Sequence, residues 1–243
     1  QDEIDRKDIR LGDKVLIERS GDVIPKIVKV IKRKNQNSIK FKIDNLCPSC
    51  GQKTVKQNDE AIIRCNNFYC PSQALGRIQH YCSKLAMNIE GLGVKIVEQL
   101  IENKLVKNID DLYSIKKNEI SKLDGLGERS AKNIIDSINN SKETTFSKFV
   151  YALGIRNVGE HTSKLLEKKF KGDMERFKNA TETELLEIDE IGEIVAQSIV
   201  SFWKDEKNSA MVQNCLNRGV IINRPIDSLS NQFSDKVFVF TGA

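Results

Sequence analysis

The side-chain sets that most enzymes use for chemistry are missing or scarce in this sequence. Only two histidines occur, and we find no Ser-His-Asp arrangement, no pair of catalytic carboxylates and no Walker phosphate loop. No stretch approaches the run of about 18 apolar residues that a membrane helix requires. The first ten residues, QDEIDRKDIR, lack the apolar core of a secretion signal. We therefore expect no complete active site within these residues, no membrane span and no secretion.

An excess of charge of one sign is also lacking, since the balance is only mildly basic. The sequence has 39 Lys and Arg against 34 Asp and Glu, a net charge of +5. This charge is compatible with a polyanionic partner, but many ordinary proteins share it. A hydrophobic content of 39% indicates a folded, intracellular protein, and 243 residues allow one large domain or two to four small ones.

Four of the six cysteines are concentrated in one short stretch with regular spacing. They form C-x2-C, fourteen residues and C-x4-C, as Cys47, Cys50, Cys65 and Cys70. Two pairs of thiolates suit tetrahedral Zn2+, and four sulfur ligands leave no position for a catalytic water. A redox-active C-x-x-C is the competing interpretation, and an Fe–S cluster is a weaker one. Cys82 and Cys215 stand apart, and we interpret them as small buried apolar residues.

Hydrophobic periodicity divides the rest of the chain into a β-rich start and a long helical region. Residues 10–43 contain three segments that alternate polar and β-branched residues, namely RLGDKVLIER, IPKIVKVIKR and SIKFKI. They predict part of a small barrel of OB type, with too few strands to close it. Residues 72–222 have helical spacing, and Val237–Phe240 predicts a buried strand without a partner. We expect the chain to begin and to end inside domains.

The helical region contains a fourfold repeat. Gly93, Gly127, Gly159 and Gly192 fall in one column, separated by 34, 32 and 33 residues. In each copy, aliphatic residues stand one and four positions before the glycine. A helical run follows each glycine. This register predicts four helix-hairpin-helix units whose aliphatic residues are buried.

The glycines of these units suit a phosphate-binding role. Glycine permits positive φ and lets a phosphate approach the backbone, while N–H groups at the start of the next helix point at the anion. The predicted DNA-contacting residues of the first three units are Gly91, Gly93, Lys95, Gly125, Gly127, Arg129, Arg156 and Gly159. In the fourth unit Asp189, Glu190 and Glu193 would repel phosphate, so we predict a packing role. The alternative is that the glycines only cap helices.

Three further polar residues near these units require separate interpretations. Lys122 lies in Lys-Leu-Asp-Gly, the K-x-D-G pattern of nucleotidyltransferases, but its column holds Asn88, Gly154 and Glu187 in the other repeats. Helical spacing follows it, whereas a nucleotidyl lysine is expected at the end of a buried strand. We therefore predict that Lys122 is not catalytic. We expect His80 to be structural or to face DNA, and His161 to be solvated.

Taken in order, several segments resemble bacterial NAD-dependent DNA ligase over essentially the whole chain. They are RKDIRLGD at 6–13, RSGDVIP at 19–25, the cysteine cluster, the four hairpins and VFVFTG at 237–242. The resemblance implies a multidomain α+β fold. It assigns a partial OB-fold to 1–45, a zinc finger to 46–72, a helix-hairpin-helix domain to 73–226 and the start of a BRCT domain to 235–243. An adenylation domain would precede these residues.

The same resemblance implies an activity and its partners. The family seals 5′-phosphate, 3′-hydroxyl nicks in double-stranded DNA through a lysine that takes AMP from NAD+, with Mg2+ or Mn2+ assistance. That lysine would lie upstream, so this chain would bind nicked DNA without sealing it, as a cytoplasmic, nucleoid-associated monomer.

Arg19, Val23 and Ile24 match positions that contact the duplex near the nick, although Val23 and Ile24 also suit an ordinary turn flank. A non-enzymatic DNA-binding module is the alternative for the whole chain. A hairpin-type glycosylase fits the cysteines poorly.

Overall fold

The computed structural model describes residues 1–21, 24–33, 38–56 and 62–224. The chain divides into two compact units, Gln1–Cys70 and Pro71–Ala243. Val23 and the residues 235–243 that were assigned to a BRCT domain lie outside the described residues. The first unit contains α1 (Asp2–Arg6), β1 (Lys14–Ser20), β2 (Ile24–Lys32), β3 (Thr54–Lys56) and β4 (Ile63–Cys65).

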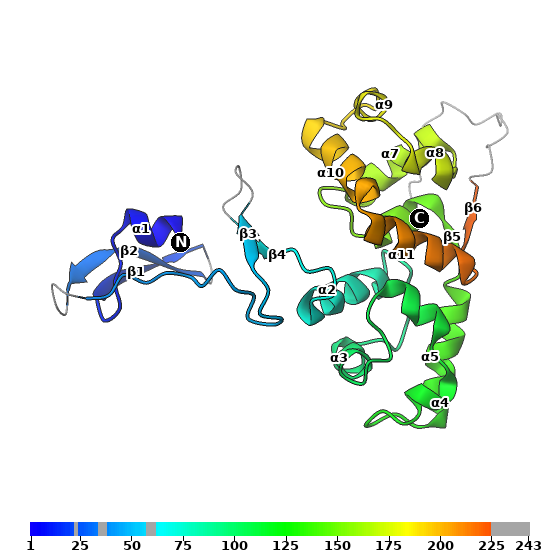
Figure 1. The fold of residues 1–243 in the computed structure, drawn as a ribbon, viewed down its shortest axis with the longest axis horizontal. Helices are drawn as coiled ribbons and strands as arrows, with labels where there is room; N and C mark the ends of the chain where they lie inside the picture. Colours follow the sequence, from blue (N-terminus) through cyan, green and yellow to red (C-terminus); the bar gives the residue numbers. More distant parts are fainter. Residues whose placement is uncertain (22–23, 34–37, 57–61, 225–243) are drawn as a thin grey trace, which may run out of the picture. The chain divides into compact units, whose positions relative to one another are not determined.

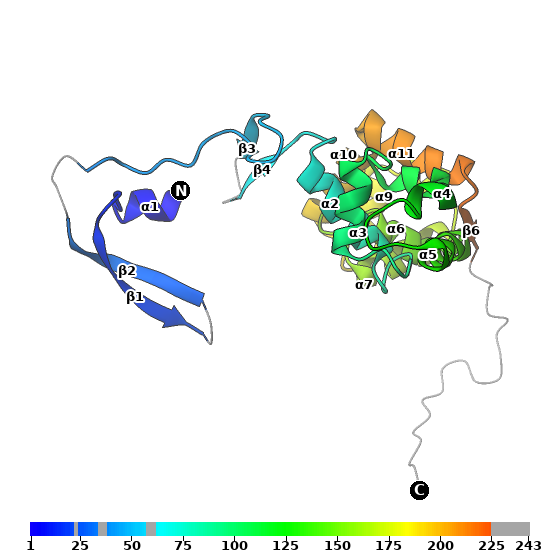
Figure 2. The same cartoon turned by 90° about the horizontal axis from the view of Figure 1, so that it is seen from below.

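The second unit is mostly helical, as the sequence predicts, and its helices pack around one another (Figures 1 and 2). Its elements are α2 (Pro71–Cys82), α3 (Val94–Glu102), the 3-10 helix η1 (Ile109–Ser114), α4 (Lys117–Ile120), α5 (Glu128–Asn140), β5 (Glu143–Thr145), α6 (Phe146–Ala152), α7 (Glu160–Phe170), α8 (Met174–Lys178), α9 (Glu182–Leu186), α10 (Glu193–Lys204), α11 (Glu206–Asn217) and β6 (Ile221–Asn223). None of the described helices is long and apolar enough to cross a membrane.

Strands β1 and β2 form an antiparallel hairpin that confirms two of the three predicted strands. Their register pairs Lys14 with Lys32 at one end and Ser20 with Ile24 at the other. The third prediction, a strand at residues 38–43, is wrong. This segment makes a single bridge between Arg10 and Lys40, and Ile39 is 72% exposed. Among the described residues no strand pairs continuously with this segment. Its alternating pattern is therefore not enough to make it a strand.

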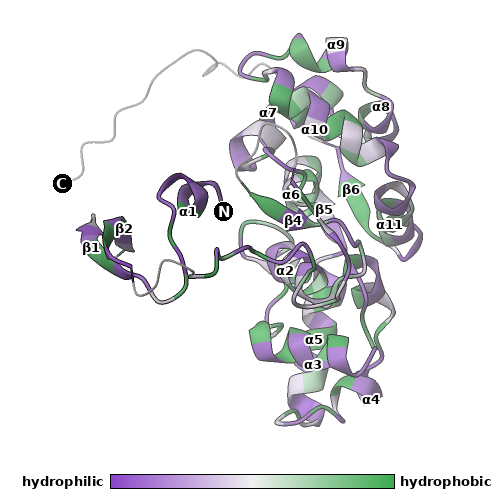
Figure 3. Ribbon diagram, turned by 60° about the vertical axis from the view of Figure 1, so that its left-hand side comes forward, coloured by the Kyte–Doolittle hydropathy of each residue, from purple (hydrophilic) through white to green (hydrophobic). Residues whose placement is uncertain are grey.

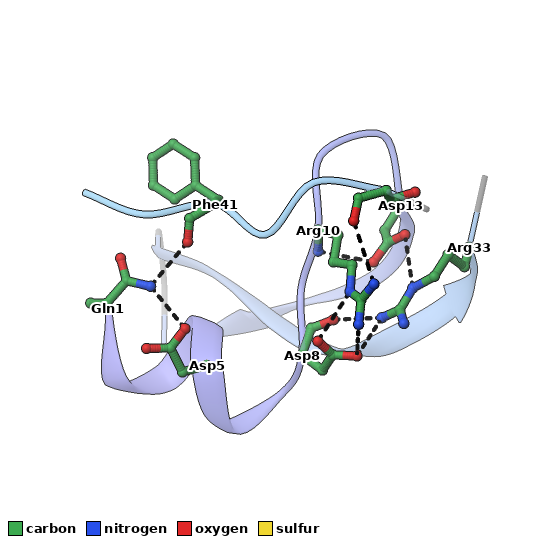
Figure 4. Close-up of polar contacts among 8 residues, drawn as sticks. Gln1, Asp5, Asp8, Arg10, Asp13, Arg33 and Phe41 are labelled. Carbon is green, nitrogen blue, oxygen red and sulfur yellow. Dashed lines mark hydrogen bonds and ion pairs between the residues drawn. The ribbon is translucent and has the colours of Figure 1, made fainter. Parts of the chain in front are cut away.

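A cluster of charged side chains ties the segment before β1 to the end of β2 (Figure 4). The buried carboxylate of Asp13 accepts the backbone N–H of Arg10 at 3.0 Å, and Arg33 Nε lies 3.5 Å from it, which is an ion-pair distance. Asp8 pairs with Arg33 at 2.9 Å, and hydrogen bonds from Arg10 and then Arg33 lower the pKa of Asp8. The charged residues of RKDIRLGD therefore brace the hairpin.

The core of the helical unit joins helices that are distant in sequence. Phe177 of α8 is fully buried, with ring centroids 5.4 Å from Phe146 of α6, 5.2 Å from Phe170 of α7 and 5.6 Å from Trp203 of α10. Helices in this unit carry both apolar and polar residues (Figure 3), as amphipathic surface helices do. The aromatic cluster fixes how the second half of the unit packs.

Two short strands that the sequence analysis missed also close this unit. Residues 143–145 of β5 pair in parallel with residues 221–223 of β6, so the end of the unit returns to its middle. Arg218, just before β6, pairs with Asp110 of η1 at 3.1 Å. Strands of three residues are too short to show an alternating pattern, which is why they were not predicted.

Candidate nucleic-acid interface and zinc centre

Each of the four repeats forms a tight hairpin before a helix, and its aliphatic residues are pinned inside. Seven of the eight aliphatic residues are buried and Leu126 is half-buried. In the second, third and fourth hairpins the later aliphatic N–H donates to the earlier carbonyl at 3.0–3.1 Å, as in Leu126 to Leu123. The predicted burial is therefore confirmed.

Positive φ occurs in every hairpin, but not at the shared glycine column. It falls two residues earlier, at Gly91 (86°), Gly125 (73°), Asn157 (60°) and Glu190 (69°). This residue is third in the four-residue turn, where type II turns require positive φ. Glycine permits positive φ, but the sequence did not show which glycine of each pair would adopt it, and the turn needs that conformation at the earlier position. Asn157 occupies this position in the third hairpin, because asparagine tolerates the left-handed conformation, and Glu190 in the fourth bears the strain of a longer side chain.

The shared glycines instead stand at the N-caps of α3, α5, α7 and α10. Their φ values are −69°, −104°, −90° and −90°, with extended ψ, so any residue could adopt this backbone. All four are exposed. A Cβ built on any of them would meet no described atom within 4 Å. Internal packing therefore gives no reason for glycine, whereas the approach of an external group would.

These four helices differ from others in the unit in how they begin. Helices α6, α8, α9 and α11 start with Thr145, Asp173, Thr181 and Asp205, whose side-chain oxygens accept a backbone N–H of the first turn. Helices α3, α5, α7 and α10 have no side-chain cap among the described residues. Among the described residues, the N–H groups of the first two residues of each of these helices have no acceptor, and they lie at the positive end of the helix dipole, which is the geometry of an anion site.

Charge ranks the four helix starts as anion sites. Helix α3 has no acidic residue in its first turn and carries the exposed Lys95. Helix α5 carries the exposed Arg129, and its Glu128 pairs with Lys117 at 2.6 Å, which lowers the pKa of Glu128. In α10, an exposed isoleucine stands where α3 and α5 have their cations.

The third hairpin is intermediate between these cases. Glu160 of α7 pairs with Lys164 at 2.6 Å, and Arg156 is half-buried beside the turn. The predicted order of phosphate affinity is therefore first, second, third and then fourth hairpin.

Hairpins one and two hold each other in place, and so do three and four. Gln99 of α3 accepts the N–H of Asp124 at 2.8 Å and donates to its carbonyl at 3.2 Å. In return, Ser137 of α5 accepts the N–H of Glu90 at 2.7 Å. These side-chain hydrogen bonds, which were not predicted from the sequence, hold the two turns together.

The second pair of hairpins has its own two contacts. Asn157 donates to Ser198 of α10 at 3.1 Å, and His161 of α7 lies 3.0 Å from Glu190. Gln99 and Ser198 both stand six residues after the shared glycine of their repeat, a signal that could have identified them.

Gly91 needs to be glycine for reasons internal to the fold, which predicts a stability loss on substitution. A Cβ there would lie 2.9 Å from Cγ1 of the buried Ile134, and φ is 86°. Gly91→Ala should therefore lower the free energy of unfolding by about 3 kcal/mol through strain and overpacking. Gly125→Ala, with φ of 73° but nothing within 4 Å among the described residues, should cost about 1 kcal/mol. Urea unfolding measures both, and equal losses would contradict the packing argument.

The residues of the β1–β2 hairpin that the resemblance assigns to DNA lie at its turn end. Arg19 is exposed and pairs in register with Pro25, and Ile24 is 72% exposed. Val23, the third of this set, lies outside the described residues. An exposed cation and an exposed aliphatic residue therefore share one end of the hairpin, and their contact with DNA stays a prediction.

The remaining singled-out residues occupy varied places. Lys122 is exposed in the turn after α4 and is in none of the described strands. His80 is half-buried, and its Nε2 donates to the carbonyl of Tyr151 at 2.7 Å. His161 is exposed as predicted, but it is paired with Glu190. Cys82 and Cys215 are buried, and burial raises the pKa of each thiol to about 12.

The four clustered cysteines meet at one point in the first unit. Their sulfurs all lie within 4.8 Å of one another, with Cys47 and Cys70 at 3.8 Å and Cys50 and Cys65 at 3.6 Å. A tetrahedron of Zn–S bonds of about 2.3 Å has sulfurs about 3.8 Å apart. A disulfide would need about 2.05 Å, so the distances favour a metal. The four sulfurs suit tetrahedral Zn2+ and would fill all four coordination positions, so no position would remain for a substrate.

The backbone around the sulfurs prepares them for a cation. Gly51 has φ of 70° and donates to the carbonyl of Cys47 at 2.8 Å, which closes the first knuckle. The backbone N–H of Gln52 and the side chain of Asn67 lower the pKa of Cys50 to about 6. A backbone hydrogen bond at Asn67 lowers the pKa of Cys65, but burial and the neighbouring thiols outweigh it and raise that pKa to about 12. A dication would relieve this crowding of thiolates.

Four segments of the chain match family models. Residues 1–39 match the NAD-dependent DNA ligase OB-fold domain, and residues 47–71 match the NAD-dependent DNA ligase C4 zinc finger domain. Residues 83–140 match a SAM-like helix-hairpin-helix tandem, and residues 148–212 match a helix-hairpin-helix motif. The two helix-hairpin-helix matches coincide with the two pairs of hairpins that hold each other in place.

Whole-chain comparison agrees with these matches. The chain is 44% identical over its full length to a DNA ligase of Geobacter sulfurreducens, 41% over 99% to one of Nitrosococcus oceani and 38% over 99% to one of Francisella tularensis. It spans only 36% of the length of each of these relatives. The chain therefore combines segments that match the OB-fold and zinc-finger domains of NAD-dependent DNA ligases with two helix-hairpin-helix segments, along a stretch that is similar throughout to proteins named DNA ligase.

Proposed function

We propose that this chain is the DNA-gripping C-terminal portion of an NAD-dependent DNA ligase that seals 5′-phosphate, 3′-hydroxyl nicks in duplex DNA. The NAD+ that donates AMP and the Mg2+ or Mn2+ that assists transfer would bind mainly in a segment that is not part of this chain. The residues here would hold and orient the duplex as a monomer in the bacterial cytoplasm, at the nucleoid. The observation that carries this proposal is that helices α3, α5 and α7 begin at exposed glycines with no side-chain cap among the described residues.

The division of labour among the proposed contacts follows from their chemistry. Backbone N–H groups after Gly93 and Gly127 would bind phosphate oxygens, and Lys95 and Arg129 would add charge beside them. Such contacts grip the duplex without reading its sequence. Arg19 would neutralise a further phosphate, and Ile24 would press on the sugar edge of the minor groove. The zinc module would connect these two DNA-binding regions.

A non-enzymatic repair module with the same parts is the competing function. The ligase is favoured because the OB-fold and zinc-finger models that match are those of NAD-dependent DNA ligases, and because relatives named DNA ligase match along this whole chain. The competing function would leave those two matches without an explanation.

The zinc-loaded chain alone is expected to bind nicked duplex DNA but not to take up AMP. Anisotropy of labelled DNA should give a slope of log affinity against log salt of about −0.9 per phosphate neutralised. Incubation with NAD+ labelled in the adenylate should leave the protein unlabelled, because Lys122 stands in an exposed turn. A labelled chain that loses its label in Lys122→Ala would refute the assignment of Lys122. Affinity independent of salt would refute the phosphate grip.

A further inference from the structure

A groove of about 460 Å³ lies between helix α2 and the segment that leads into the third hairpin. One wall is a face of α2 that carries Gln73, Gly76 and Arg77. The opposite side includes the buried apolar residues Leu153 and Ile155, each 3% exposed. The groove therefore combines a polar wall and an apolar floor, immediately beside a proposed phosphate-binding hairpin.

The charge of this groove suits an anion. Arg77 is the only side chain of fixed charge among the described residues that line it, and none of those residues is a carboxylate. A larger groove of about 850 Å³ beside the first hairpin has the opposite character, since Glu90, Asp136 and Glu143 line it with one lysine. A polyanion would be repelled from the larger groove and attracted to the smaller one.

Arg77 is held at the groove by a buried partner. Its Nε donates to Oδ1 of Asn108 at 3.4 Å, and Asn108 is 4% exposed. A guanidinium has five N–H donors, so it can keep this contact and still bind a phosphate oxygen. On the neighbouring turn of α2, His80 is fixed to the carbonyl of Tyr151. The wall is thus pre-organised by contacts to the rest of the unit.

Gly76 is the feature of the groove that the fold itself does not explain. It lies in the middle of a twelve-residue helix, where glycine is the least favourable residue after proline. It is exposed, and a Cβ built there would meet no described atom within 4 Å outside its own helix backbone. Neither a turn nor a close helix contact requires glycine here. A ligand that lies against the helix surface would require it.

We propose that this groove holds one sugar-phosphate unit of a DNA strand, so that Gln73, Gly76 and Arg77 extend the DNA-binding surface onto α2. The phosphate lies at Arg77 and Gln73, and the deoxyribose lies over Gly76 and the apolar floor. This inference rests on the proposed function, because it adds a contact to the same DNA-binding surface. It assigns α2 a role beyond that of a spacer between the zinc module and the hairpins.

Two substitutions in the zinc-loaded full chain test the groove by anisotropy with a labelled nicked duplex. Gly76→Leu fills the groove and should weaken affinity about tenfold, while the melting temperature stays equal or rises because leucine favours helix. Arg77→Gln should weaken affinity about tenfold for every sequence and lower the salt slope by about 0.9. Ala210→Leu, an equally bulky change at an exposed site in α11, is the matched control and should bind as wild type.

The outcomes separate this inference from the proposed function. Wild-type affinity in Gly76→Leu, with or without a loss in Arg77→Gln, would overturn the groove as a DNA site and leave the hairpin grip intact. A wild-type chain that binds no duplex would overturn the proposed function itself. Losses in both variants without a fall in melting temperature, together with an unaffected Ala210→Leu control, would establish α2 as part of the DNA surface.

Discussion

Valine at both Gly93 and Gly127 is expected to weaken duplex DNA binding about 100-fold, with similar losses for all sequences. Each shared glycine stands before a helix start whose N–H groups would bind a phosphate. A hydrogen bond to a charged group contributes about 1.5–3 kcal/mol, so each blocked hairpin should lose at least about tenfold. The backbone at both sites is extended, and a Cβ meets no described atom within 4 Å. The loss should therefore come from the DNA side.

Gly192→Val is the matched control for this experiment. Gly192 has the same N-cap geometry, but its hairpin carries Glu190 and Glu193 and no cation in the first turn of its helix. Valine at an N-cap should lower the free energy of unfolding by about 1 kcal/mol. Thermal unfolding should show this loss equally at Gly93, Gly127 and Gly192. Only Gly93→Val and Gly127→Val should lose affinity. If Gly192→Val loses as much, or if the loss depends on base sequence, the phosphate role is wrong.

Removal of zinc is expected to unfold the segment around the four cysteines and leave the helical unit folded. Structural zinc contributes about 10–16 kcal/mol of apparent binding free energy in small domains, more than such a segment could retain without it. The two short strands beside the cysteines pair over only three residues each. The helical unit has its own aromatic core at Phe177, so its melting temperature should not change.

Cys65→Ser provides the same test without a chelator. Zinc content should fall from one ion per chain to none, and hydrogen exchange should show lost protection at Thr54–Lys56 and Ile63–Cys65. Cys215→Ala, a buried cysteine of the helical unit, should keep one zinc and lower only the helical melting temperature. Retention of zinc in Cys65→Ser would show that this cysteine is not a required ligand. Parallel unfolding of the helical unit would show that zinc does not stabilise the cysteine segment alone.

Much of this architecture could be predicted from the sequence because it depends on burial. The aliphatic residues before each glycine recur at fixed spacing, and seven of the eight are buried. Cysteine spacing likewise predicted a cluster that the distances support. In contrast, the strand at 38–43 was predicted from alternation alone, and alternation cannot indicate whether a partner strand is present.

Other features could not be predicted because they depend on contacts across the fold. Each of the first two hairpins contains two glycines, and either glycine could adopt positive φ. The sequence therefore did not show which of the two would take the left-handed conformation. The hydrogen bonds of Gln99 and Ser137 involve side chains that are common on helix surfaces. The groove beside α2 forms only when the third hairpin packs near that helix. Gly76 was the one visible sign of it, as a glycine inside a helical run.

The contrast between bare and capped helix starts has a consequence for protein engineering. Serine or aspartate at a helix N-cap usually adds about 1 kcal/mol of stability, and sequence-based design methods favour them there. At the first three hairpins such a change would place an oxygen acceptor where a nucleic-acid oxygen is proposed to bind. Such a substitution would raise the melting temperature but lower the affinity for DNA. A thermostable variant of this protein should therefore gain its stability at other positions.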